Sequence, residues 1–132
     1  MELLEREVAR ARRYARPLSL IAASSQGLDL SAERVSKVWM ALARDVDFGS
    51  YRESVGWTMV LPETGRSGAS FAAERFRRGL ESELGSALPA LAVVTYPFHG
   101  AGGEALMDSA MRLCRAAGLG TVTVGELRAE DP

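Results

Sequence analysis

Residues 57–64 read Trp-Thr-Met-Val-Leu-Pro-Glu-Thr and residues 72–77 read Ala-Ala-Glu-Arg-Phe-Arg; these two stretches decide the fold. The apolar run up to Leu61 predicts a strand, and the Pro-Glu-Thr after it is a sharp stop, because proline has no N–H for a sheet ladder. A helix is predicted over residues 65–82, with Thr64 or Ser67 as its N-cap. Its inward face is an apolar stripe at helical spacing: Ala69, Ala73, Phe76 and Leu80.

The chain before this unit alternates helices with strands. Residues 46–52 are predicted to form a hairpin with residues 57–61, turning at residues 53–56. Ser31 starts a preceding helix that stops at residues 43–44. The core stripe of that helix is Val35, Val38, Trp39 and Leu42.

At the N-terminus, a helix over residues 2–15 with the stripe Leu4, Val8, Ala11 and Ala15 is ended by Pro17, and the apolar residues 18–23 predict a buried strand. The stripe has two interpretations, packing on its own domain or ending a signalling helix.

The C-terminal part continues the same alternation. Residues 90–96 predict another buried strand, residues 99–103 a flexible connector, and residues 121–124 a short closing strand. The helix between them, residues 104–117, has Leu106, Ala110, Leu113 and Ala117 inward. Strands alternating with helices indicate an α/β fold around one sheet, and the central hairpin makes that sheet mixed or antiparallel.

Composition narrows the function classes. The 132 residues are 47% apolar and 25% charged with a formal net charge of −1, which is typical of a folded domain and argues against nucleic-acid binding by phosphate neutralisation. No apolar run approaches the ~18 residues of a membrane span, and residues 1–16 lack a secretion signal, so we expect a cytoplasmic protein. Cys114 is the only cysteine and is expected to pack in a helix; His99 is not expected to bind metal.

Three stretches together resemble the GGDEF domains of diguanylate cyclases. They are residues 10–21, residues 57–77 with their Leu-Pro-Glu-Thr and Ala-Glu-Arg motifs, and residues 94–100 with Tyr-Pro-x-x-Gly. The resemblance implies a nucleotide-cyclase palm-like α/β fold, a five-stranded mixed sheet flanked by helices. It also implies that residues 1–132 form a single degenerate GGDEF domain, with residues 1–16 as the signalling helix.

The family's signature motif is replaced. In register with Pro62, its position reads Glu53-Ser54-Val55-Gly56-Trp57, so that Val55 occupies the metal-carboxylate position and Gly56 the adjacent acid. Magnesium prefers oxygen ligands, which valine and glycine side chains do not supply. The aspartate that ends the family's first strand corresponds to Ser24.

Other catalytic positions of the family are also altered. The guanine-holding loop is shortened to residues 26–30, and the phosphate-binding Lys and Arg fall on Ala117 and Thr121. The resemblance therefore implies a degenerate cyclase with no catalytic residue, no metal ligand and no cofactor.

A second, regulatory site of the family binds cyclic di-GMP through an Arg-x-x-Asp motif nine residues before the signature. Here that register holds Arg44-Asp45-Val46-Asp47, and a third family contributor matches Arg75. An arginine fork can take guanine O6 and N7, and a carboxylate can take the N1–H and N2–H donors. The resemblance implies a cyclic di-GMP site at Arg44, Asp47 and Arg75, with the ligand bound as a stacked pair that bridges two copies.

Each of these residues also has a simpler interpretation. Arg44 and Asp47 could form an exposed ion pair at a helix end, and Arg75 could be a surface residue beside other arginines. Asp45 and Arg52 flank the motif and could contribute. Arg44 is expected to be exposed, so that its substitution leaves the fold intact.

Three functions follow as hypotheses. The first is a catalytically inactive cyclic di-GMP receptor, and the second is a nucleotide-free protein-interaction or dimerisation module. The third is an altered active site that binds GTP without turnover.

Overall fold

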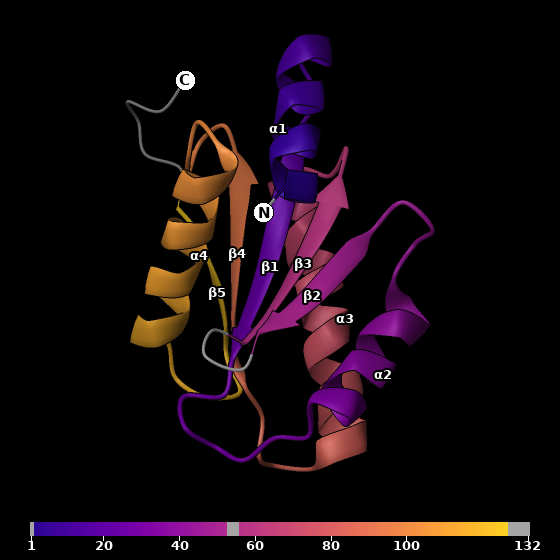
Figure 1. Cartoon of the computed structure of the whole chain (residues 1–132). Helices are drawn as coiled ribbons and strands as arrows, with labels where there is room; N and C mark the ends of the chain where they lie inside the picture. Colours follow the sequence, from indigo (N-terminus) through magenta and orange to yellow (C-terminus); the bar gives the residue numbers. More distant parts are fainter. Residues whose placement is uncertain (1, 53–55, 127–132) are drawn as a thin grey trace.

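The computed structural model describes residues 2–52 and 56–126, and within them five strands form one mixed sheet (Figure 1). The strands are β1 (Leu18–Ser24), β2 (Phe48–Arg52), β3 (Gly56–Pro62), β4 (Ala90–Tyr96) and β5 (Val122–Val124), in the order β2-β3-β1-β4-β5. β1 is antiparallel to both β3 and β4, β2 is antiparallel to β3, and β5 is parallel to β4. The predicted α/β class and mixed sheet are confirmed.

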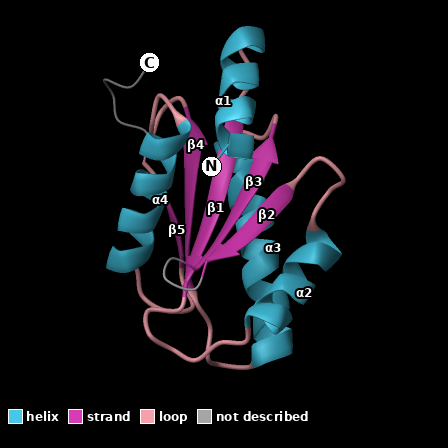
Figure 2. Cartoon of the chain, viewed as in Figure 1, coloured by secondary structure: helices cyan, strands magenta, loops and turns pink. Residues whose placement is uncertain are grey.

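Two layers of helices cover the sheet (Figure 2). α1 (Glu2–Tyr14) and α4 (Gly103–Ala116) lie over one face, and α2 (Ala32–Leu42) and α3 (Arg66–Leu84) lie over the other. β1 is buried on both faces because it occupies the middle of the sheet: Ile21 joins the core under α2 and α3, and Leu20 joins the core under α1 and α4. Alternate residues of one strand therefore serve two cores.

The predicted stripes agree with the burial in the main. Ser31 is the N-cap of α2 and accepts a hydrogen bond from the backbone N–H of Arg34. All four inward residues predicted for α3 are buried. α1 buries its stripe only as far as Ala11, because Ala15 lies beyond the helix end, exposed, with φ of 51°. In α4, Cys114 is buried as expected, whereas Leu113 is only partly buried.

Two predicted details near the central turn are wrong. The N-cap of α3 is Gly65, and neither Thr64 nor Ser67 caps the helix. Thr64 instead donates its hydroxyl to the carbonyl oxygen of Pro62 at 3.0 Å. β2 begins at Phe48, because residues 44–47 form a turn closed by the backbone N–H of Asp47 on the carbonyl oxygen of Arg44.

The connector before α4 is tied to its surroundings, in contrast to the flexible segment expected there. His99 Nδ1 accepts the backbone N–H of Thr95 at 2.8 Å, and its Nε2 lies 3.1 Å from the carbonyl oxygen of Glu126. Ser109 donates its hydroxyl to the carbonyl oxygen of His99. The imidazole therefore joins β4 to the chain leaving β5, and its two nitrogens are engaged in structural contacts.

In the described ranges, none of the helices combines the length and the apolar character needed to cross a membrane.

Candidate functional site

The three residues predicted to bind a ligand line one groove. Arg44 and Asp47 come from the turn between α2 and β2, and Arg75 comes from the middle of α3. The groove is open, has a volume of about 190 Å³, and its remaining lining is mostly apolar: Trp39, Leu42, Leu61, Thr64, Gly68 and Ala72. Arg44 and Arg75 are 31 positions apart in sequence, yet they line the same groove. The resemblance implied this proximity.

Arg44 and Asp47 form a closed ion pair. Arg44 Nη2 donates to Asp47 Oδ1 at 2.7 Å, and Arg44 Nε lies 3.2 Å and 3.1 Å from the two carboxylate oxygens. The backbone N–H of Arg44 donates to Asp47 Oδ2 at 2.9 Å. The Asp47 side chain is only 3% exposed, whereas that of Arg44 is 52% exposed. The expected exposure of Arg44 is correct, but its guanidinium neutralises a buried carboxylate.

The turn after β3 supplies two more contacts to Arg44. Nη2 donates to the hydroxyl oxygen of Thr64 at 2.7 Å and to the carbonyl oxygen of Pro62 at 3.2 Å. Hydrogen bonding to Asp47 raises the pKa of Arg44 further above its ordinary value, outweighing the opposite effect of burial. The guanidinium is therefore charged and fixed in direction at the groove.

Arg75 is the second cation of the groove. It is exposed, and it has no hydrogen bond or ion pair within residues 2–52 and 56–126. Its neighbour Arg77 is engaged differently, with Glu74 at 2.7 Å and Glu81 at 3.1 Å. Arg75 thus presents an unneutralised donor fork to the groove. Asp45 and Arg52 are exposed and do not line it.

A second, larger cleft of about 690 Å³ opens where β1 ends. It is lined by Ser24, Gln26, Asp29, Tyr51, Gly56, Trp57 and Arg115, among others. Of the replaced signature, residues 53–55 lie outside the described residues. Gly56 has φ of +114°, and a Cβ built there would collide with the carbonyl oxygen of Ala23. A side chain at this signature position, an acid included, requires the backbone to move.

The phosphate-binding positions inferred from the resemblance do not gather in this cleft. Ala117 is the C-cap of α4, Thr121 is exposed, and neither lines the cleft. Sequence reasoning missed Arg115, which does line it. A basic residue in the last turn of a helix was the available signal, but its place depended on where α4 meets the loop after β1.

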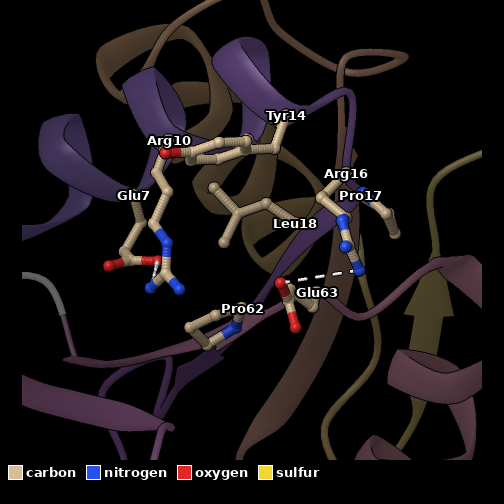
Figure 3. Close-up of a pocket in the computed structure, with 9 residues that line it drawn as sticks. Glu7, Arg10, Tyr14, Arg16, Pro17, Leu18, Pro62 and Glu63 are labelled. Carbon is tan, nitrogen blue, oxygen red and sulfur yellow. Dashed lines mark ion pairs between the residues drawn. The ribbon is translucent and has the colours of Figure 1, made fainter.

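A third depression, shown in Figure 3, is lined by residues of α1, the start of β1 and the turn after β3. Its volume is about 10 Å³, roughly one water molecule. Its arginines face glutamates: Arg16 lies 3.7 Å from Glu63, and Arg10 lies 3.9 Å from Glu7. It is too small and too well neutralised to bind an organic ligand.

The clustering of His, Cys, Asp and Glu side chains and the environment of Cys114 bear on metal and thiol chemistry. No group of three His, Cys, Asp or Glu side chains in those residues is placed to hold a metal ion. Cys114 is fully buried, and burial raises the pKa of its thiol to about 12. The thiol is therefore protonated at neutral pH, and its environment is that of a packing residue.

Comparison with solved structures identifies the fold. The GGDEF domain of YfiN (TpbB) from Pseudomonas aeruginosa matches with a TM-score of 0.75 and 16% identity over 96% of this chain and 87% of that one. The active GGEEF domain of a diguanylate cyclase from Vibrio cholerae matches with a TM-score of 0.72 and 17% identity, over 98% of this chain and 94% of that one. The coiled coil and GGDEF domain of DgcB from Caulobacter crescentus, in complex with c-di-GMP, matches with a TM-score of 0.71 and 16% identity. The match covers 94% of this chain and 78% of that one.

The chain therefore has the GGDEF fold, and the resemblance seen in its sequence is confirmed at that level. No family model and no curated protein matches the sequence.

Proposed function

We propose that this GGDEF-like chain is a catalytically inactive receptor that binds cyclic di-GMP in the groove of Arg44, Asp47 and Arg75. The observation that carries the proposal is the convergence on one groove of three residues that were named from the sequence resemblance before the structure was known. Two guanidinium groups suit the acceptor atoms of guanine and the phosphodiester oxygens. As in the complex of DgcB, the ligand is cyclic di-GMP; a stacked pair would bridge two copies of the chain.

The proposed catalytic inactivity rests on the second cleft, the one that opens at the end of β1 and is called the strand-end cleft below. Phosphoryl transfer needs metal ions and a clamp on the phosphates. Ser24 and Gly56 stand at two of the family's acidic positions, and the conformation of Gly56 resists a carboxylate side chain. Asp29 is the only carboxylate that lines the cleft among the described residues. GTP binding without turnover has little support, because Arg115 is the only cation there in the same ranges.

Calorimetric titration with cyclic di-GMP, with GTP and Mg²⁺ as the comparison, tests the proposal. We expect saturable binding near two ligands per chain, selective over GTP, and no formation of cyclic di-GMP from GTP. Arg75→Ala should weaken binding about 10- to 100-fold, as expected for lost charge-assisted hydrogen bonds. Arg78→Ala is the matched control, since Arg78 is exposed on the same helix but does not line the groove.

Arg44 needs a different substitution. The exposure of Arg44 alone predicted that its substitution leaves the fold intact, but Arg44 neutralises the buried carboxylate of Asp47. Arg44→Ala is therefore expected to destabilise the fold as well as the site. Arg44→Lys keeps the charge but removes the planar fork, so it should lose affinity with a smaller loss of stability.

A protein-interaction or dimerisation module is the second candidate. Large apolar side chains are exposed on and after α2 and on α3: Met40 at 73%, Val46 at 60% and Phe71 at 63%. If the wild-type protein binds neither cyclic di-GMP nor GTP, the receptor hypothesis is rejected and the interaction module is favoured. Concentration-dependent dimerisation without nucleotide would then identify the partner as a second copy of the chain.

A further inference from the structure

Of the two edges of the sheet in the described residues, β2 is the longer and the less protected one. β5, at the opposite edge, has three residues, which leaves little strand to pair with. β2 has five residues in uninterrupted register with β3, without a bulge. It contains no proline or lysine, and its single charge is that of Arg52 at its last position. The devices by which natural sheets block edge pairing are therefore missing from β2.

The backbone of β2 carries hydrogen-bonding groups that its own sheet does not use. In an antiparallel pair, the N–H and C=O groups of alternate residues point toward the neighbouring strand, and those of the other residues point away from it. Within residues 2–52 and 56–126, no strand lies along the outer side of β2, and no backbone hydrogen bond reaches it there (Figure 2). The four residues from Gly49 to Arg52 are exposed. This edge is thus open to a further strand.

Apolar side chains border this edge on the side of α2. Gly49 and Tyr51 lie opposite Met59 and Trp57, which belong to the core under α2 and α3. A groove of about 170 Å³ between α2 and β2 includes all four of these residues together with Met40. Met40 is 73% exposed and Tyr51 is 43% exposed. A strand added to the edge of β2 would cover part of this apolar surface.

The sequence of β2 is complementary to itself in the antiparallel direction. We infer that β2 pairs with β2 of a second copy of this chain, about a two-fold axis at Ser50. In this register Tyr51 lies opposite Gly49 of the second copy, and Arg52 lies opposite Phe48, each pair occurring twice. An aromatic side chain beside an edge glycine covers its bare backbone, and an arginine is attracted to the face of a phenylalanine ring. No two like charges are opposed.

This pairing goes beyond the proposed function, because it needs no nucleotide and uses no residue of the groove of Arg44, Asp47 and Arg75. A strand of a different protein could add to the same edge, but the match of β2 with itself favours a second copy. The contact joins two short strands and part of one groove, so we expect a weak dimer with a dissociation constant of about 10–100 µM.

Charge substitution at the two-fold axis tests both the dimer and its register. Sedimentation velocity is measured without nucleotide at concentrations up to about 500 µM. Ser50→Lys places like charges opposite each other and should weaken self-association roughly tenfold or more, and Ser50→Asp should do the same. An equimolar mixture of the two variants should dimerise again, because opposite charges then face each other. Ser82→Lys and Ser82→Asp, on the exposed face of α3, are the matched controls and should associate like the wild type.

Amide hydrogen exchange locates the contact. The amides of β2 should exchange more slowly at high than at low protein concentration, and Ser50→Lys should remove this difference. Urea denaturation verifies that each variant is folded, since a lysine on a monomeric edge strand is well tolerated.

Three outcomes overturn the inference. They are a wild-type protein that stays monomeric, which leaves the edge to a strand of another protein or to no partner, a dimer that Ser50→Lys does not weaken, and a mixture of the two charge variants that does not dimerise. Because all samples are free of nucleotide, these outcomes are independent of the titration with cyclic di-GMP. A monomer that binds cyclic di-GMP would reject this inference and retain the proposed receptor.

Discussion

Gln26 caps the C-terminus of α4 from 91 residues away: its side-chain nitrogen donates to the carbonyl oxygen of Ala117 at 2.7 Å. The same nitrogen donates to the carbonyl oxygen of Cys114 at 2.8 Å. The last carbonyls of a helix have no partners within it, and α4 ends without a glycine C-cap. One amide from the loop after β1 therefore closes the helix and borders the strand-end cleft.

Replacing this amide should destabilise the fold. Gln26→Ala removes both hydrogen bonds, and we expect the free energy of unfolding to fall by about 1–2 kcal/mol. Urea denaturation measures the change. Arg112→Ala, an exposed substitution on α4 itself, should stay within about 0.5 kcal/mol of the wild type. Equal effects of the two substitutions would show that the cap contributes nothing.

Gly56 should tolerate no side chain. Its φ of +114° disfavours other residues, and a Cβ would also meet the carbonyl oxygen of Ala23. Gly56→Ala should therefore destabilise by more than the roughly 1 kcal/mol of backbone strain alone. Gly27→Ala separates the two causes, because Gly27 has φ of +91° with open space around it. In thermal unfolding, the melting temperature of Gly56→Ala should be well below that of Gly27→Ala.

The same geometry bears on catalysis. Gly56→Glu restores the acid at that signature position, but we expect a destabilised protein and no cyclic di-GMP from GTP with Mg²⁺, because Ser24 and Val55 still supply no carboxylate. Measurable cyclase activity in this single variant would contradict the proposed loss of the active site.

The sequence was sufficient to predict the helices and strands, because the apolar periodicity and the residues that end each element indicate the same boundaries. The stripe of α3 and the proline that ends β3 place their elements within a few residues. It was insufficient where a side chain had two possible partners. Threonine is a common N-cap residue, yet the hydroxyl of Thr64 bonds Arg44 and the carbonyl oxygen of Pro62 instead. These partners are available because the turn between α2 and β2 packs against the turn after β3.

The candidate site was predictable in part for the same reason. The resemblance to the family identified Arg44, Asp47 and Arg75, and the fold brings them to one groove. The closure of Asp47 by Arg44 depends on the tight turn at residues 44–47, and Arg115 depends on the packing of α4. The residue types allowed both features, an ion pair at the helix end for Arg44 and Asp47 and a basic last turn for Arg115, but only the tertiary contacts select them.

Cys114 should make stability fall at alkaline pH. Burial raises the pKa of its thiol from 9.0 to about 12, so the unfolded chain loses this proton first as pH rises. The contribution is present in full below pH 9 and is lost as pH rises toward 12. At pH 10.5 the loss should be on the order of 1–2 kcal/mol. Unfolding free energies from pH 8 to 10.5 should decline more steeply in the wild type than in Cys114→Ala; parallel declines would contradict the assignment.

Ser19 connects the core to the groove, so its loss should affect both. Its buried hydroxyl lies 2.9 Å from the hydroxyl of Thr95 and donates to the carbonyl oxygen of Thr64. Ser19→Ala leaves these buried partners unsatisfied, and we expect a loss of about 1–3 kcal/mol in the free energy of unfolding. Ser50→Ala, on the exposed edge strand β2, is the matched control.

The second effect of Ser19→Ala separates a structural from a functional role of the turn. With the carbonyl of Thr64 released, the hydroxyl that holds Arg44 is less well placed, and affinity for cyclic di-GMP should fall a few-fold at temperatures where the variant is fully folded. Calorimetry at low temperature measures this directly. A destabilised variant with wild-type affinity would mean that the turn keeps its geometry without Ser19, and that the hydrogen bonds of Thr64 to Arg44 and Pro62 are sufficient to orient the groove.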